Sequence, residues 1–258
     1  MSSVLLEIKN AVAIITLNRP EKFNSFTGEM ALLFQKILDD CAADKKIRCI
    51  YLTGSGKAFC AGQDLSELTK KDAPGFDKIL SEHYNPIVAR IRNIEKPVVC
   101  AVNGVAAGAG ANIALCCDIV VASISASFIQ AFSKIGLIPD SGGTYFLPRL
   151  IGFQKASAFM MLGDKVSATD GEKMGMVYKV FPDEIFEEES MKIAITLSQM
   201  PTKGLAYTKQ ALNQSLSNSF EQQLKAEDKL QYAAAQTHDY GEGVKAFLEK
   251  RSPKFKGE

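Results

Sequence analysis

Two loops rich in small residues could present backbone N–H groups to a negatively charged ligand atom. The first is Lys57-Ala58-Phe59-Cys60-Ala61-Gly62-Gln63-Asp64-Leu65, and the second is Asn103-Gly104-Val105-Ala106-Ala107-Gly108-Ala109-Gly110-Ala111. Glycine lets a backbone N–H approach a ligand closely, and the start of a helix carries partial positive charge. Two such groups directed at one point would form an oxyanion hole. Each loop taken separately is more simply a tight turn that needs small residues.

One acidic residue, Asp140, stands just before a predicted helix. Asp140 follows Pro139 and precedes a predicted helix that begins near Ser141. From the residues alone, an N-terminal helix cap is the simpler role for this aspartate. Two other acids have structural interpretations. Asp118 is expected to form hydrogen bonds where a buried helix gives way to a strand, and Asp64 is expected to support the first small-residue loop.

Nucleotide and metal chemistry are not predicted. Gly54-Ser55-Gly56-Lys57 lacks the first glycine and the final hydroxyl residue of a P-loop. Gly108-Ala109-Gly110 is followed by Ile113, where a dinucleotide fingerprint needs a small residue. The chain has two histidines and six cysteines but no Cys-x-x-Cys pair, so we expect neither a metal ion nor a separate cofactor.

The composition is that of a globular protein in a reducing compartment. The 258 residues are 47% hydrophobic and 23% charged, enough to bury a large core. Because 30 basic and 29 acidic side chains give a net charge of +1, no overall field directs the chain to nucleic acid or an anionic membrane. The sequence shows neither a signal-peptide pattern nor an apolar run of transmembrane length, so we expect a cytoplasmic location.

The elements that would hold these residues alternate between strand and helix. A hairpin within 4–17 and strands at 49–53, 98–102 and 119–122 alternate with helices at 27–41, 79–92, 108–117, 141–150 and 157–162. This alternation is typical of an α/β core. After Pro182 the pattern predicts only helices, near 184–199, 202–217, 219–237 and 241–250. We therefore divide the chain into a core, residues 1–197, and a helical C-terminal region, residues 198–258, suited to oligomer contacts.

Six separated motifs follow one another along nearly the whole chain. They are Asn18-Arg19-Pro20-Glu21-Lys22-Phe23-Asn24-Ser25, Phe59-Cys60-Ala61-Gly62-Gln63-Asp64-Leu65, Ala101-Val102-Asn103-Gly104, Cys117-Asp118-Ile119, Gly136-Leu137-Ile138-Pro139-Asp140-Ser141-Gly142-Gly143-Thr144 and Phe247-Leu248-Glu249-Lys250-Arg251. In this order they resemble the crotonase family, the enoyl-CoA hydratase and isomerase superfamily. The resemblance implies a spiral of ββα units, and a helical C-terminal region that forms trimers, often paired into hexamers.

The resemblance also implies an acyl-CoA thioester as the substrate, with CoA as part of it. The thioester oxygen would lie between the backbone N–H groups of Gln63 and Gly110. The residues implied near CoA are Lys22, Phe23, Ala61, Asp64, Leu65, Phe247 and Lys250, the last two reaching the CoA of a neighbouring subunit. The acyl pocket is expected to include Leu68, Asn112, Phe132 and Tyr145, together with the stretch from Leu68 to Tyr84.

The acids that are present favour isomerisation over hydration. Hydratases of the family activate water with two glutamates, and the corresponding positions here are Asn112 and Phe132. Neither side chain can take a proton from water. Isomerases of the family place one acid where Asp140 stands, and one is enough because the proton removed at one carbon is returned at another. An apolar pocket would raise the pKa of Asp140 towards that of a useful general base.

The segment around Asp140 is most similar to the phenylacetate-pathway branch of the family. Enzymes of that branch isomerise a ring-epoxidised phenylacetyl-CoA to its oxepin form, and they shift the double bond of 3-enoyl-CoA esters to the 2-position. We expect one or both of these activities. Two alternatives stay open. One is hydration or thioester hydrolysis with Asp140 acting on water, and the other is a catalytically silent member that binds acyl-CoA or RNA.

Overall fold

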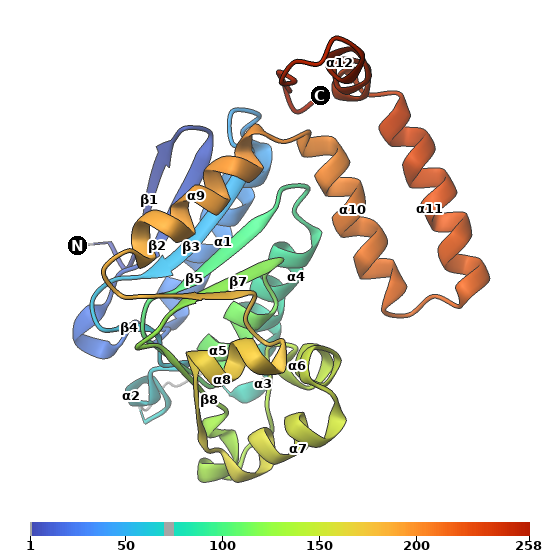
Figure 1. Cartoon of the computed structure of the whole chain (residues 1–258). Helices are drawn as coiled ribbons and strands as arrows, with labels where there is room; N and C mark the ends of the chain where they lie inside the picture. Colours follow the sequence, from blue (N-terminus) through green and yellow to red (C-terminus); the bar gives the residue numbers. More distant parts are fainter. Residues whose placement is uncertain (1, 70–74) are drawn as a thin grey trace.

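A six-stranded sheet forms the centre of the protein in the computed structural model, which describes residues 2–69 and 75–258. In spatial order it contains β1 (Val4–Lys9), β2 (Val12–Leu17), β3 (Cys49–Gly54), β5 (Val98–Val102), β7 (Ile119–Ser123) and β10 (Lys179–Phe181) (Figure 1). Only β1 and β2 are antiparallel, which confirms the predicted hairpin. Asn10 and Ala11 form its turn with φ angles of 51° and 60°, a conformation that asparagine tolerates well.

A second sheet, which the sequence analysis did not predict, has four strands of three residues each. In spatial order they are β4 (Ala58–Cys60), β6 (Val105–Ala107), β8 (Ser127–Ile129) and β9 (Lys165–Ser167). The pairs β3/β4, β5/β6 and β7/β8 each give their first strand to the larger sheet and their second to the smaller one. This is the spiral expected from the resemblance. The spiral places the end of β4 beside the end of β6. Each of these strands lies within one of the two small-residue loops.

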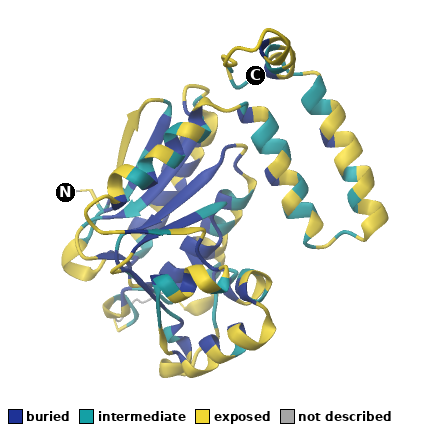
Figure 2. Cartoon of the chain, viewed as in Figure 1, coloured by how far each residue is buried: buried dark blue, intermediate teal, exposed yellow. Residues whose placement is uncertain are grey.

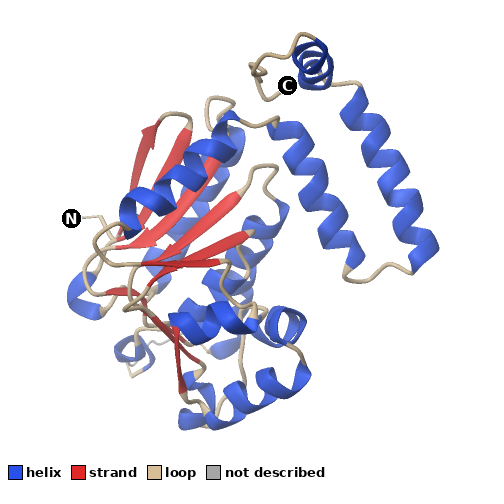
Figure 3. Ribbon diagram, in the orientation of Figure 1, coloured by secondary structure: helices blue, strands red, loops and turns tan. Residues whose placement is uncertain are grey.

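Apolar side chains alternate between the two faces of the larger sheet, and helices pack on both faces. Ile15, Ile50 and Cys100 point to one face, where they pack with helices α1 (Gly28–Ala43) and α4 (Asn85–Asn93). Their sequence neighbours point to the other face, under helix α9 (Phe186–Gln199). Figure 3 shows α9 lying across the strands. Figure 2 shows β3, β5 and β7 buried between these layers, whereas the edge strand β1 is mostly exposed. The helix predicted at 27–41 is confirmed as α1, and Thr27 caps it by accepting a hydrogen bond from Met30 N–H.

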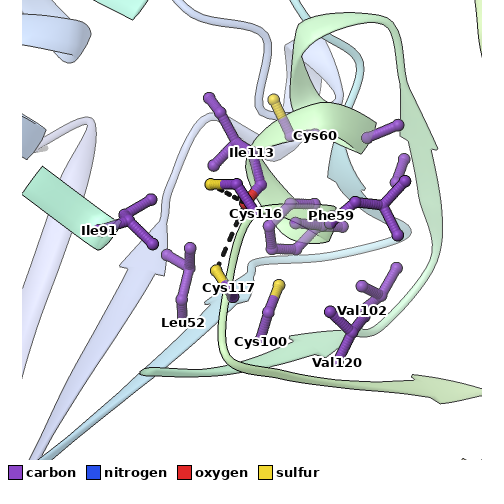
Figure 4. Close-up of a cluster of buried hydrophobic side chains, with 14 of the residues drawn as sticks. Leu52, Phe59, Cys60, Ile91, Cys100, Val102, Ile113, Cys116, Cys117 and Val120 are labelled. Carbon is purple, nitrogen blue, oxygen red and sulfur yellow. Dashed lines mark hydrogen bonds between the residues drawn. The ribbon is translucent and has the colours of Figure 1, made fainter. Parts of the chain in front are cut away.

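The small-residue helix α5 (Ala109–Leu115) is buried along its whole length. Cys116 and Cys117 follow it, and their thiols donate to the main-chain oxygen of Ile113 at 3.2 and 3.3 Å. Figure 4 shows both thiols beside Cys100 of β5 among aliphatic side chains. All six cysteines of the chain are buried and carry free thiols.

Two short helices, α2 (Leu65–Leu68) and α3 (Phe76–Lys78), were not predicted. The other helices follow the predicted order with shifted ends, and they are α6 (Gly143–Ile151), α7 (Phe153–Leu162), α8 (Ala168–Met174), α10 (Thr202–Ser215), α11 (Phe220–Ala235) and α12 (His238–Leu248). Ser167 caps α8, and Ser219 with Gln222 forms a reciprocal capping box on α11, as their spacing predicts. The predicted helix over 79–92 begins instead with a π-helical segment, Ile79–Tyr84, before α4.

Helices α10, α11 and α12 form an arm that extends away from the two sheets (Figure 1). The division predicted at residue 197 falls within the last turn of α9, a helix that still packs on the larger sheet. Within the described ranges 2–69 and 75–258, no helix is long and apolar enough to cross a membrane.

Asp118 joins this arm to the core. Its carboxylate accepts from Val98 N–H at 2.8 Å, and it pairs with Arg92 of α4 at 3.1 Å and with Lys209 of α10 at 2.8 Å. Lys209 is only 6% exposed, and its ammonium also donates to the main-chain oxygen of Ile91 at 2.7 Å. The predicted structural role of Asp118 is therefore confirmed.

Replacing Asp118 should weaken the attachment of the arm. Asp118→Ala leaves the buried Lys209 ammonium without its counter-charge, so we expect the free energy of unfolding to fall by about 3 kcal/mol. Urea unfolding measures the change. The control is Asp40→Ala, which removes an exposed pair with Lys36 and should cost about 0.5 kcal/mol or less. Equal losses in the two variants would contradict the role of Asp118.

Candidate active site

The two small-residue loops meet where the end of β4 lies against the start of α5. The strands β4 and β6 pair in parallel, with Cys60 opposite Ala106. A Cβ atom built on Gly110 would lie 2.4 Å from the main-chain oxygen of Cys60, and one built on Gly62 would lie 3.0 Å from that of Ala107. Only glycine permits so close an approach of the two backbones, which explains the glycine in each loop.

Two amide groups are left free to face a ligand at this junction. Gln63 forms an isolated parallel bridge with Phe26, in which Gly62 O accepts from Phe26 N–H and Asp64 N–H donates to Phe26 O. Because consecutive groups alternate along an extended chain, the N–H of Gln63 points away from Phe26. Gly110 is the second residue of α5, where a helix has no internal partner for its N–H groups. Within residues 2–69 and 75–258, both predicted oxyanion residues therefore carry a backbone donor that is not used in strand or helix pairing.

The side chain of Gln63 is held by a residue that the sequence analysis did not single out. Tyr84 ends the π-helical segment, and its hydroxyl donates to Gln63 Oε1 at 2.8 Å. The tyrosine is 1% exposed, and its ring packs edge-on against Phe26 with centroids 6.0 Å apart. Burial, together with nearby groups that include Asp140, raises the pKa of Tyr84 well above its ordinary value. The hydroxyl therefore stays protonated and keeps Gln63 in place.

Asp64 fixes the loop that carries Gln63. Its carboxylate accepts from Ser66 N–H and Oγ at 3.1 and 2.6 Å, which caps α2, and it pairs with Arg19 at 2.8 Å. The hydrogen bond from the Ser66 hydroxyl, helped by Arg19, lowers the pKa of Asp64 to about 2. The predicted supporting role of Asp64 is confirmed. Its proximity to CoA stays a prediction, and its carboxylate faces these protein groups.

Four of the residues expected near CoA form an exposed surface beside this loop. Phe23 is 54% exposed and Leu65 is 52% exposed, and the exposed Ala61 donates its N–H to Phe23 O at 2.9 Å. Lys22 is exposed in the turn before Phe23. Asn24 anchors this turn, because its buried amide donates to Ser55 O and Ala58 O.

The other two residues expected near CoA lie elsewhere in the chain. Phe247, which is 83% exposed, ends α12 with Leu248, and Lys250 follows shortly after. Figure 1 shows α12 at the far end of the arm from β4 and α2. One copy of the chain does not bring Phe247 to the oxyanion junction. Their contact with the CoA of a neighbouring subunit stays a prediction.

Asp140 lies in the loop between a 3-10 turn, Ala131–Ile135, and α6. Its carboxylate does not cap that helix, which corrects the simpler interpretation from the residues alone. The main-chain oxygen of Asp140 accepts from Gly143 N–H at 2.8 Å instead. The carboxylate accepts from the Ser141 hydroxyl at 2.9 Å, while burial raises its pKa above the ordinary value. A half-buried carboxylate with a raised pKa is suited to moving a proton.

The residues predicted for the acyl pocket fall into two groups. Asn112 is buried on α5 and donates to the main-chain oxygen of Asp140, and the ring of Phe132 would lie 3.8 Å from a Cβ on Gly108. These two lie around the start of α5. Tyr145 is 39% exposed under the guanidinium of Arg149, and Leu68 ends α2 half-buried. Residues 70–74 of the predicted pocket stretch lie outside the described residues.

Sequence reasoning did not assign a role to Arg19 or Gln130, and it named Tyr84 only as the end of the predicted pocket stretch, without its contact to Gln63. Arg19 stands in the first quoted motif, but its partner Asp64 is 45 positions away. Tyr84 lies within the predicted helix 79–92, and the apolar spacing of that range does not distinguish a π-helical turn from an α-helical one. Gln130 is fully buried and donates to Asn112. Only the fold brings each of these partners together.

Comparison with known proteins gives one consistent picture. The family model described as Enoyl-CoA hydratase/isomerase matches residues 7–258. The chain is 45% identical to a 1,2-epoxyphenylacetyl-CoA isomerase of Escherichia coli strain K12, over 100% of this chain and 99% of that protein. It is 34% identical to a 2,3-dehydroadipyl-CoA hydratase of the same organism, over the full length of both. A crystal structure of an enoyl-CoA hydratase from Bacillus anthracis covers 100% of both chains with a TM-score of 0.92 and 30% identity.

A side chain at Gly110 should force the two loops apart. In Gly110→Ala the new methyl group would overlap Cys60, so we expect the free energy of unfolding to fall by about 1–3 kcal/mol. Gly241→Ala is the matched control, because no described atom beyond its chain neighbours and its own helix backbone lies within 4 Å of its Cβ position, and alanine favours a helix. Chemical denaturation of both variants makes the test. A neutral Gly110→Ala would show that the backbones are not in close contact.

The low pKa of Asp64 predicts how the stability of the loop depends on pH. The pKa is about 2 in the folded protein against an ordinary 3.8, so the stabilisation is present above pH 3.8 and is lost as the pH falls towards 2. The difference in unfolding free energy between the wild type and Asp64→Asn should therefore narrow across that window. Denaturation series at several pH values measure it, with Asp40→Asn as an exposed control. A difference that stays constant down to pH 2 would contradict the prediction.

Proposed function

The chain belongs to the enoyl-CoA hydratase/isomerase family, and we propose that it is an acyl-CoA isomerase that works through a thioester enolate. The substrate is a ring-epoxidised phenylacetyl-CoA, a 3-enoyl-CoA, or both. The first would become its oxepin isomer and the second a 2-enoyl-CoA. Neither reaction gains or loses an atom.

One observation carries this proposal. Asp140 has a carboxylate with a raised pKa, and its main-chain oxygen accepts a hydrogen bond from Asn112 of α5, the helix that also carries Gly110. For a 3-enoyl ester, Asp140 takes a proton from C2, and the electron pair moves to the thioester oxygen. The N–H groups of Gln63 and Gly110 hold that oxyanion, each contributing on the order of 3 kcal/mol. Asp140 then returns the proton at C4, which leaves the double bond at the 2-position.

The names of the relatives include both isomerases and hydratases, so the residues at the site must decide between the two reactions. The positions that carry glutamates in hydratases of the family hold Asn112 and Phe132 here. Asn112 already uses its amide in two hydrogen bonds within the protein. A second base for activating water is therefore not supplied from either position, which favours isomerisation over hydration.

The binding of CoA and self-association form part of the same proposal. Lys22, Phe23, Ala61 and Leu65 offer an exposed surface beside the oxyanion junction, suited to the CoA moiety. A groove of about 460 Å³ among α10, α11 and α12 is lined by apolar side chains that include Val244, Phe247 and Leu248. Such a surface is suited to a further copy of the chain. The trimer or dimer of trimers, and the cytoplasmic location, stay predictions.

The decisive experiment replaces the base while keeping its shape. Asp140→Asn should bind an acyl-CoA as the wild type does, and its turnover should fall by about 10²- to 10⁴-fold because general base catalysis is lost. A spectrophotometric and mass-resolved assay with a 3-enoyl-CoA and a 2-enoyl-CoA measures both reactions. Calorimetric titration with the ester measures binding. Asp40→Asn, at an exposed site on α1, is the control.

The two substrates separate isomerisation from hydration. Conversion of the 3-enoyl ester without a change of mass, lost in Asp140→Asn, supports the proposal and leads to the ring epoxide as the next substrate. Rapid addition of water to the 2-enoyl ester would establish a hydratase instead. Full activity of Asp140→Asn would mean that another group moves the proton.

A further inference from the structure

We propose that Asn112 and Gln130 form an amide relay that positions Asp140 against the oxyanion helix; this role rests on the proposed function. Gln130 Nε2 donates to Asn112 Oδ1 at 2.7 Å, and Asn112 Nδ2 donates to the main-chain oxygen of Asp140 at 2.9 Å. Asn112 is 1% exposed and Gln130 is 0% exposed. Both are positioning residues, because they act through Asp140.

The direction of the relay follows from its last acceptor. The main-chain oxygen of Asp140 can only accept, so Asn112 must turn its NH₂ group towards it. The Asn112 oxygen then faces Gln130, which must in turn present its own NH₂ group. Only one orientation of each amide satisfies both contacts. This orientation leaves Gln130 Oε1 buried without a partner in the described part of the chain.

The relay connects the two halves of the site directly. Asn112 lies two residues after Gly110 on the same helix, so its hydrogen bond fixes the Asp140 backbone relative to an oxyanion donor. Gly143 holds the same Asp140 oxygen from the other side through its N–H. A Cβ on Gly143 would lie 2.3 Å from Asn112 Nδ2, so glycine at this position makes room for the amide. These two hydrogen bonds fix the backbone of Asp140, from which the carboxylate extends, and the Ser141 hydroxyl contacts the carboxylate itself.

Packing alone gives a poor account of this pair of amides. Burying Gln130 Oε1 without a hydrogen-bond partner in the described part of the chain costs free energy. Two apolar side chains of the same shape would avoid that cost. What the amides provide is a directional contact to Asp140. They provide it without a second negative charge beside the base, which a carboxylate at position 112 would add.

The test compares turnover, not only stability. Asn112→Leu removes the donor at similar volume, and we expect kcat on a 3-enoyl-CoA to fall by about 10- to 100-fold, since a displacement on the order of 1 Å has that effect. KM should change little, because the oxyanion N–H groups and the CoA surface remain. The double variant Asn112→Leu/Gln130→Met also removes the orphan oxygen. It should be at least as stable as Asn112→Leu and should keep the low kcat.

Two further variants separate positioning from folding. Asn213→Leu removes an amide on α10 that binds Arg92 and, among the described residues, makes no hydrogen bond to Asp140, and it should leave kcat unchanged even if stability falls. In an Asp140→Asn background, Asn112→Leu should cause no further loss, because the residue that it positions is already inactive. Wild-type kcat in Asn112→Leu, or an equal loss in both backgrounds, would overturn the relay alone. Full activity of Asp140→Asn would overturn the proposed function itself.

Discussion

The contact between the start of α5 and the end of β4 sets the geometry of the whole site. Gly110 stands so close to the Cys60 carbonyl that no larger residue fits, and this contact fixes how near the Gln63 and Gly110 amides can come to each other. The spiral of strands makes the contact possible, because β4 and β6 end side by side in the smaller sheet. Most of the other polar contacts near the site hold one of these two segments in place.

Those contacts differ in kind between the first loop and the buried part of the site. Asp64 holds the first loop by an ion pair with Arg19 and by hydrogen bonds from the exposed Ser66. Tyr84 and Asn112 act inside, where an unpaired polar group is costly, and each makes a directional hydrogen bond to one part of the site. A loop that is braced on both sides presents its amides without reorganising when charge develops, which is the condition for an effective oxyanion hole.

The longer elements could be predicted from the sequence, and the shorter ones could not. The strands of the larger sheet up to β7 have five or six residues with a clear apolar pattern. Thr27, Ser167 and Ser219 mark the starts of their helices, because their hydroxyl groups accept N-cap hydrogen bonds from the first turn. The strands β4, β6, β8 and β9 have three residues each, too few for a period to show. The two glycine loops stand out by their small residues, but their joint role and the role of Asp140 were assigned through the resemblance. The pairing of Asn112 with Gln130 depends on a turn of the spiral that no local pattern encodes.

The six buried thiols have a practical consequence. Because a cysteine inside the core meets a reagent only when the surrounding structure opens, its rate of alkylation measures how often that opening occurs. The cysteines are well distributed for this purpose. Cys41 ends the buried face of α1, Cys60 lies at the oxyanion junction, and Cys100 lies in the central sheet. The chain thus carries built-in chemical reporters, with which mass spectrometry can map the order in which its layers come apart.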